Sequence, residues 1–206
     1  MSSFPDQSPV DCRERMIQAA AETFMSEGYR ASIDQIASRA GVARQTVYNH
    51  FASKEDLFSE VAHIAASGIL VSLDEKGGGL RERLVRFGAT FRHRLIGDEG
   101  LALFRTISAE SPRFPDLGRA FYAKGPGQMN RRLADFLKHA MDEENLRRDD
   151  PKYAAETLLA MLDCGDRSRR LFGAPLLPAR AEKARVARII DCFLRAFAPS
   201  HRKDFP

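Results

Sequence analysis

Residues 31–58 have the sequence ASIDQIASRAGVARQTVYNHFASKEDLF, and this stretch decides the fold of the 206-residue chain. Its first apolar residues, at positions 33, 36, 37 and 40, are spaced so that they share one face of a short helix. Gly41 follows, where a chain that leaves a helix often needs a positive backbone angle. A second short helix, residues 43–50, is expected to bury Val47 and to turn its polar side chains outward. A polar helix held at a steep angle by its neighbour fits the major groove of DNA.

Two serines mark helix starts on either side of this pair. Ser32 is expected to cap the first short helix through its hydroxyl. Ser53 is expected to cap a third helix, with Asp56 as the carboxylate of a capping-box variant. Lys54 lies at the start of that helix, where a cation opposes the helix dipole. This placement suggests another task for Lys54, such as contact with a phosphate oxygen.

The stretch therefore predicts a DNA-binding surface with two classes of side chain. Base contacts are expected from Arg44, Gln45, Thr46 and Asn49, and phosphate contacts from Ser32, Tyr48, His50 and Lys54. The alternative is an ordinary three-helix packing unit with a polar exposed face, because this packing also occurs in proteins that touch no DNA.

The charge distribution qualifies this prediction. The net charge of the chain is +4, yet residues 1–58 carry six Lys and Arg against eight Asp and Glu. Within residues 30–54, however, four cations face only Asp34. Phosphate contact depends on where the charges lie. We therefore expect modest affinity for one DNA-binding segment, and useful binding only when two segments engage one duplex.

The spacing of these residues closely resembles the DNA-binding domain of TetR-type repressors, over roughly residues 11–60. The matching positions are Ile36-Ala37, Ala40-Gly41-Val42, Val47-Tyr48, Phe51, Lys54-Glu55 and Leu57. Two positions depart from the commonest pattern. Ala43 stands where Ser or Thr often caps the second helix, and Gln45 stands where a small residue is frequent. The resemblance implies a DNA-binding domain followed by a larger helical domain for effector binding and dimerisation.

Composition and cysteine usage indicate a soluble protein of the cytoplasm. The chain is 44% hydrophobic and 29% charged, which allows a real core. No run of apolar residues approaches the roughly twenty that span a bilayer. The N-terminus has no basic stretch followed by an apolar one, so we expect no secretory signal and no membrane association. The three cysteines are far apart and form no CxxC pair, which favours a reducing compartment.

The whole chain is expected to be all-α. Residues 1–10 are assigned to a flexible arm, residues 11–58 to the DNA-binding domain, and residues 59–206 to a helical effector-binding and dimerisation domain. No sustained alternation of apolar and polar residues follows residue 58, so no strand is predicted. The predicted helices cover residues 53–74, 80–96, 101–110, 116–145 with a bend at Gly125-Pro126-Gly127, 151–172 and 181–198. The segment 109–117, with Phe121-Tyr122 soon after, resembles the AefR- and AcrR-like branches of the same family.

The last two predicted helices carry apolar stripes that could pair two copies of the chain. Two stripes from each of two subunits can form a four-helix bundle. The candidate interface residues are Leu158, Leu162, Ile189, Ile190, Phe193 and Phe197. The alternative is that both stripes are buried within their own subunit, since helices that face a core show the same pattern. A homodimer would place two DNA-binding units on successive major grooves of a pseudo-palindromic operator.

Aromatic and methionine side chains are frequent in the middle helices, where they form either an apolar ligand pocket or a solid core. The candidate ligand-binding residues are Phe87, Phe91, Phe104, Ile107, Phe121, Tyr122, Met129 and Met161. The pocket alternative rests chiefly on the resemblance, which implies an unknown small-molecule effector that shifts the helices and releases the DNA. A regulator without any small-molecule ligand stays the alternative.

Catalytic, metal and cofactor motifs are not found. The sequence has no GxSxG, HExxH, P-loop or dinucleotide fingerprint, and no His-x3-His pair. We therefore expect a non-enzyme with no cofactor and no metal. A helical adaptor that binds other proteins would use the same apolar stripes, but it would have no reason to present the polar helix 44–50 beside Lys54. The sequence favours a DNA-binding transcriptional regulator, with repression as its expected effect.

Overall fold

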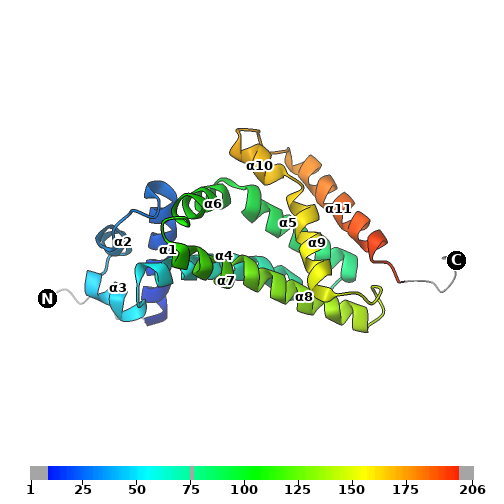
Figure 1. The fold of residues 1–206 in the computed structure, drawn as a ribbon, viewed down its shortest axis with the longest axis horizontal. Helices are drawn as coiled ribbons and strands as arrows, with labels where there is room; N and C mark the ends of the chain where they lie inside the picture. The colour runs from blue at the N-terminus through cyan, green and yellow to red at the C-terminus, as the bar shows by residue number, and fades with distance from the viewer. Residues whose placement is uncertain (1–8, 75–76, 200–206) are drawn as a thin grey trace. The chain divides into compact units, whose positions relative to one another are not determined.

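The computed structural model describes residues 9–74 and 77–199, and within these ranges it contains helices and no strand. The all-α prediction is confirmed. The helices are α1 (Pro9–Glu27), α2 (Ile33–Ala40), α3 (Arg44–His50), α4 (Lys54–Asp74), α5 (Leu80–Ile96), α6 (Asp98–Glu110), α7 (Pro115–Lys124), α8 (Pro126–Asp142), α9 (Pro151–Asp163), α10 (Asp166–Leu171) and α11 (Ala179–Ala196) (Figure 1).

The helices form two compact units, and their boundary differs from the division expected at residue 58. The first unit contains the chain up to Ile64 and also Ala102–Gly125, so it includes most of α6 and all of α7. The second unit contains Ala65–Leu101 and the chain from Pro126 onward. Helical periodicity shows which face of α6 is apolar but not which core covers that face. The sequence therefore could not assign α6 to one of the two units. The functional division at residue 58 stays a prediction.

The first unit is built around a core in which α1, α2 and α4 meet. α1 packs against α2, and α2 against α3 (Figure 1). The rings of Phe24 and Phe58 lie edge to face with centroids 4.9 Å apart. Ile107 of α6 and Leu117 of α7 are buried in the same cluster. The segment predicted to bind DNA and these two later helices therefore share one core.

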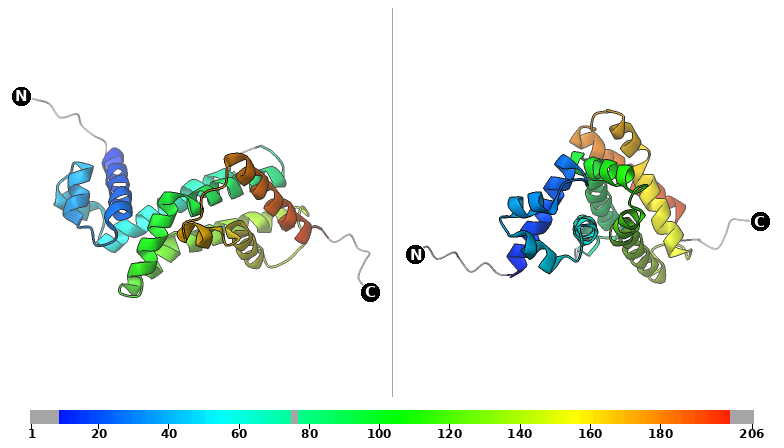
Figure 2. Two further views of the ribbon diagram at one scale, coloured as in Figure 1. Left: turned by 90° about the horizontal axis from the view of Figure 1, so that it is seen from above. Right: turned by 60° about the vertical axis from the view of Figure 1, so that its left-hand side comes forward.

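The second unit packs α5, α8, α9 and α11 together. α9 lies along α8, and α11 lies against α5 and α9 (Figures 1 and 2). Gly88 permits the close approach of these helices. A Cβ atom there would lie 3.0 Å from Leu162 Cδ2 and 3.1 Å from Val186 Cγ1. The cluster of fully buried side chains includes Leu133, Leu158 and Phe193.

Several helix boundaries differ from the sequence-based expectations. The helix predicted for residues 151–172 is broken at Cys164 and Gly165, which both adopt left-handed backbone angles (φ 46° and 71°). The predicted bend in 116–145 is a full break, because the chain leaves the helical region at Gly125. α6 begins at Asp98, earlier than expected. Residues 1–8 of the predicted arm lie outside the described residues, and Pro9 already belongs to α1.

α4 is the longest helix of the described chain. Its apolar side is not buried throughout, because Ile64, which is expected on that side, is 45% exposed. Of the helices within residues 9–74 and 77–199, α4 alone is long and apolar enough to cross a membrane by length and composition. This differs from the expectation that no stretch approaches that limit. More than half of the apolar stretch is buried inside the fold, as in the core helix of a globular domain.

A buried guanidinium joins four helices of the second unit. The Arg92 side chain of α5 is fully buried, and its Nη2 donates to Asp166 Oδ2 at 2.8 Å. Its Nε donates to Glu182 of α11, and its Nη1 donates to the carbonyl of Leu162 in α9. The positive charge is thus paired and hydrogen-bonded on three sides, as a buried charge must be.

Arg81 provides a matched exposed pair, because it also connects α5 to α11. Its Nε donates to Asp191 Oδ1 at 2.6 Å and its Nη2 to Oδ2 at 3.0 Å, with both side chains more than a third exposed. We expect Arg92→Met to lower the free energy of unfolding by about 3 kcal/mol, the lower end of the range for a broken buried pair. Asp166 and Glu182 both lose their fully buried partner, but Arg185 still pairs with Asp166 at 2.9 Å. Arg81→Met should leave the unfolding midpoint nearly unchanged, because solvent screens an exposed pair. Urea unfolding at one fixed protein concentration measures both, and equal effects would contradict the assignment.

Candidate nucleic-acid interface

α2 is fixed at both ends by its own sequence. The Ser32 hydroxyl accepts from the Gln35 amide at 3.2 Å, and the Gln35 side chain accepts from the Ser32 amide at 2.6 Å. This capping box confirms the predicted Ser32 cap and adds Gln35, which the sequence analysis missed. Gly41 ends the helix with φ 67°, as expected. The apolar face of α2 is buried over its whole length.

α3 is a short helix held by one buried side chain. Val47 is 1% exposed, whereas Arg44, Gln45, Tyr48, Asn49 and His50 are exposed and Thr46 is partly exposed. The predicted orientation is therefore what the structure shows. Ala43 precedes the helix in an extended conformation and gives no side-chain cap. The polar face of α3 owes its direction to Val47 and the turn before it, and not to a cap.

Side chains on this face already contact one another. Arg44 Nη1 donates to Asp34 Oδ2 of α2 at 2.9 Å. The guanidinium carbon of Arg44 lies 5.6 Å from the centroid of the Tyr48 ring, one turn along α3. Gln45 Nε2 donates to Asn49 Oδ1 at 3.1 Å. Four of the predicted DNA-binding side chains are thus paired within the protein, and their binding to DNA would exchange these contacts.

Lys54 lies over an aromatic ring at the start of α4. Its Nζ is 4.4 Å from the centroid of Tyr29, and the Tyr29 hydroxyl donates to Glu55 Oε1 at 2.7 Å. Burial lowers the pKa of Lys54, while the carboxylates of Glu55 and Glu110 oppose that shift. The Tyr29 hydrogen bond lowers the pKa of Glu55, and burial is the main cause that raises the pKa of Tyr29. Lys54 is therefore partly desolvated, and the nearby carboxylates of Glu55 and Glu110 only partly offset this effect on its pKa.

The cap of α4 confirms part of the predicted capping-box variant. The Asp56 amide donates to the Ser53 hydroxyl at 3.1 Å. The Asp56 carboxylate accepts from the Ala52 amide at 3.3 Å, one residue before the expected position, and from Lys124 Nζ at 3.0 Å. The hydrogen bond from Lys124 is the main cause that lowers the pKa of Asp56. Local sequence patterns could not reveal this link, because Lys124 is 68 residues away in α7.

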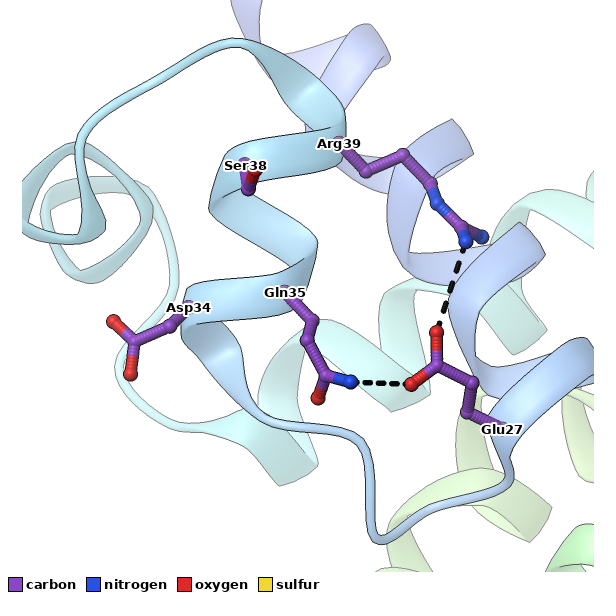
Figure 3. A pocket seen from close by; sticks show the side chains of 5 residues that line it. All are labelled: Glu27, Asp34, Gln35, Ser38 and Arg39. Atoms are coloured by element: carbon purple, nitrogen blue, oxygen red, sulfur yellow. Dashed lines mark hydrogen bonds and ion pairs between the residues drawn. The ribbon is translucent and has the colours of Figure 1, made fainter.

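A shallow hollow lies beside α2, lined by Glu27, Asp34, Gln35, Ser38 and Arg39 (Figure 3). On one side of α2, Glu27 of α1 accepts from Gln35 and pairs with Arg39 at 3.7 Å. Asp34 points away from this group (Figure 3). Glu27 therefore pairs with Gln35 and Arg39, whereas Asp34 pairs with Arg44.

The residues predicted for a ligand pocket are divided between the two cores. Phe87 and Met129 are buried in the core of the second unit, with Phe91 and Met161 packed against it. Ile107 is buried in the first core, with Phe121 against it. Phe104 is partly buried, and Tyr122 is 61% exposed. Core packing thus accounts for most of this set, and their role in binding a ligand stays a prediction.

A cleft within the second unit has a different lining. It has a volume of about 490 Å³ and is bordered by Arg83, Arg132, Phe136 and His139 among others. The guanidinium of Arg83 lies over the Phe136 ring, 4.6 Å from its centroid. None of the eight predicted ligand-binding residues lines this cleft. In residues 9–74 and 77–199, no group of three or more His, Cys, Asp or Glu side chains is placed to hold a metal ion.

Most of the residues predicted for the dimer interface are buried inside the chain itself, and their role in an interface stays a prediction. Leu158, Leu162, Ile190 and Phe193 are fully buried, and Phe197 is 3% exposed, all within one subunit. Only Ile189 of the predicted set keeps partial exposure. Apart from Ile189, these side chains belong to the apolar core of the second unit, which accounts for their burial. The sequence could not separate these alternatives because a core-facing stripe and an interface stripe share one periodicity.

Ala43 offers a test of how α3 is held. Replacement by Ser should raise the free energy of unfolding by about 1 kcal/mol, because its hydroxyl could accept from a free amide in the first turn. The residue already has the extended conformation of a helix cap (φ −72°, ψ 148°), so no backbone change is needed. Ala43→Val adds bulk without an acceptor and serves as the control. Thermal unfolding of both variants measures the effect, and equal stabilities would show that no cap forms.

Comparison with known proteins identifies both parts of the chain. The model of the family described as "Bacterial regulatory proteins, tetR family" matches residues 16–61. The model described as "AefR-like transcriptional repressor, C-terminal domain" matches residues 82–199.

Curated relatives match over the N-terminal part. The regulator AcrR of Shigella flexneri is 36% identical over 64 residues, which cover 31% of this chain and 30% of that protein. The activator FasR of Mycolicibacterium smegmatis is 44% identical over 50 residues, which cover 24% of this chain and 23% of that protein. The matches to these two relatives thus span less than a third of their length.

Solved structures match nearly the whole chain. The Flavonoid-responsive Regulator FrrA is 33% identical with a TM-score of 0.72, and the alignment covers 91% of this chain and 97% of FrrA. A TetR-family regulator from Mesorhizobium loti is 28% identical with a TM-score of 0.77, covering 93% of this chain and 100% of that one. With a matching DNA-binding domain and a matching AefR-like C-terminal domain, the chain belongs to the TetR family of DNA-binding transcriptional regulators.

Proposed function

We propose that this regulator is a repressor that binds a pseudo-palindromic operator as a homodimer and is released by a small, largely apolar effector. The observation that carries the DNA-binding part is the outward polar face of α3, fixed by the buried Val47 and the Gly41 turn. Repression is supported by the description of the matching C-terminal family as AefR-like repressors. The name of FasR, an activator, shows that a similar DNA-binding domain also serves activation.

The proposed roles follow the position of each side chain. Arg44, Gln45, Thr46 and Asn49 face outward from α3 and are assigned to base edges. Ser32, Tyr48, His50 and Lys54 are assigned to phosphates. One such unit contacts few base pairs, and paired units about 34–36 Å apart reach successive major grooves. This geometry supports the homodimer, while exposed rather than buried residues of the second unit would form its interface.

The effector response is proposed to act through α4. This helix begins beside α3, and its residues belong to both compact units. An effector that binds one arrangement of the C-terminal helices more tightly than the other would shift the population of dimers able to dock on DNA. The similarity to FrrA, a flavonoid-responsive regulator by its name, supports an aromatic, largely apolar effector. A regulator without a small-molecule ligand is the second candidate, supported by the tight core packing of Phe87, Ile107 and Met129.

Substitutions at Lys54 and Arg44 test the division between phosphate and base contacts. We expect Lys54→Ala to weaken binding to all duplexes alike and to reduce the salt slope by about one. Arg44→Ala should blunt discrimination between operator and random DNA by about 1–3 kcal/mol if its base contact is bidentate. Fluorescence anisotropy with both duplexes at several salt concentrations gives these values. If both variants lose the same factor on both duplexes, the assignment of roles is wrong.

Ligand titration tests the effector proposal. The flavonoid naringenin serves as the probe, and its affinity is measured by calorimetry for the free protein and for the protein saturated with operator. Linkage requires that operator DNA weaken effector binding by the factor by which the effector weakens DNA binding, typically about 5–150-fold. Equal affinities in both titrations would reject regulation by this class of compound. The DNA-binding assignment would stand in that case.

A further inference from the structure

Asp34 is the only Asp or Glu between Gly28 and Lys54, the segment that carries the DNA-binding face. It lies in the first turn of α2, where a carboxylate interacts favourably with the helix N-terminus. Its side chain points away from Glu27, on the opposite side of α2 from Gln35 and Arg39 (Figure 3). Its ionic partner is instead Arg44, the first residue of α3.

The contact leaves Arg44 able to bind DNA. A single hydrogen bond of 2.9 Å joins Arg44 Nη1 to Asp34 Oδ2. A guanidinium has five N–H donors, so the Nε and Nη2 edge stays available to a base. The side chains of Arg44 and Asp34 are 58% and 60% exposed, so the pair lies in solvent on the polar side of the motif. The Tyr48 ring lies 5.6 Å from the guanidinium carbon and supports it from a second side.

The pair is poorly explained as a device for stability. Exposed ion pairs typically contribute less than about 1 kcal/mol to folding. A carboxylate on a DNA-facing surface also repels phosphates, which lowers affinity for any duplex. Because the Asp34 carboxylate lowers affinity for every duplex, its benefit must lie in another property of DNA binding, namely selectivity. Restricting a flexible arginine in advance reduces the ordering that binding requires, and this favours one defined contact over many generic ones.

We propose that Asp34 is a specificity-determining residue of the DNA-binding site, an inference that rests on the proposed function of α3. Asp34 positions Arg44 for a base edge and prevents the same guanidinium from pairing with whichever phosphate is near. It acts through Arg44 and is a positioning residue, not a base-contacting one. Its removal should therefore raise affinity for random DNA while reducing the preference for the chosen site.

The experiment uses two duplexes of equal length and composition. One is the sequence that the wild-type chain enriches from a randomised pool, and the other is its scrambled version. Asp34→Asn removes the charge with little change in shape. We expect it to bind the scrambled duplex about 3–10-fold more tightly, with a salt slope steeper by about one, because Arg44 becomes free to pair with a phosphate. The preference for the selected duplex should fall by about tenfold, within the range of one bidentate base contact.

Two further variants separate this role from a general charge effect. Glu27→Gln removes the same charge from the acidic residue that pairs with Arg39, on the other side of α2. It should change binding to both duplexes by one common factor and leave the preference intact. In an Arg44→Ala background, Asp34→Asn should no longer change the preference, because the residue through which Asp34 acts is absent.

The possible outcomes distinguish this inference from the proposed function. The role of Asp34 would be overturned if Asp34→Asn behaved like Glu27→Gln, or if it reduced the preference just as much in the Arg44→Ala background. Either result would leave α3 as the DNA-binding helix. Failure of the wild-type chain to enrich any sequence from the pool would reject the proposed function and this inference together. Circular dichroism melting confirms that each variant is folded in the assay.

Discussion

The burial of one apolar face fixes the direction of the α3 side chains assigned to DNA. Ile36 of α2 and Val47 of α3 are at most 1% exposed, and both belong to the core that contains Phe24 and Phe58. α3 is only seven residues long, so a helix of this length would be unstable in isolation. Its stability comes from Val47 and from the tight turn at Gly41. Without this packing, the polar residues of α3 would have no common direction.

The same core reaches well beyond the DNA-binding segment. Ile107 and Leu117 are buried beside residues of α1 and α4, although they belong to α6 and α7, much later in the chain. Charged contacts reinforce this arrangement, including the pair between Lys124 Nζ and Asp56 Oδ1 at 3.0 Å. α6 and α7 cannot separate from the DNA-binding helices without exposing apolar surface. In the proposed mechanism, these helices would therefore move together with α3.

Several side chains of the predicted DNA-binding surface contact one another or a neighbouring ring. Arg44 pairs with Asp34, Gln45 bonds to Asn49, and Lys54 lies over the Tyr29 ring. The exposed pairs on α3 contribute little to stability, but all of these contacts reduce the number of side-chain conformations. The net affinity for DNA then depends on how far the new interactions with the duplex exceed the interactions within the protein that binding breaks. Such a surface favours selectivity over strength of binding, which agrees with the small excess of positive charge within residues 30–54.

Local pattern was enough to predict the all-α class, the capped start of α2, the turn at Gly41 and the outward face of α3. These features depend on residues within about ten positions of one another, where helical periodicity and capping rules apply directly. The placement of α6 and α7 in the first unit, the burial of Leu158 and Phe193 inside one subunit and the contact between Arg44 and Asp34 required the tertiary structure. An apolar stripe shows that a helix has a face to bury, but its partner is chosen by chain folding over long separations. The sequence alone therefore determined the all-α class and the apolar faces of most helices, because both follow from local periodicity. Only the tertiary structure decided where the long helical stretches break, at Gly125 and at Cys164–Gly165, and what covers each face.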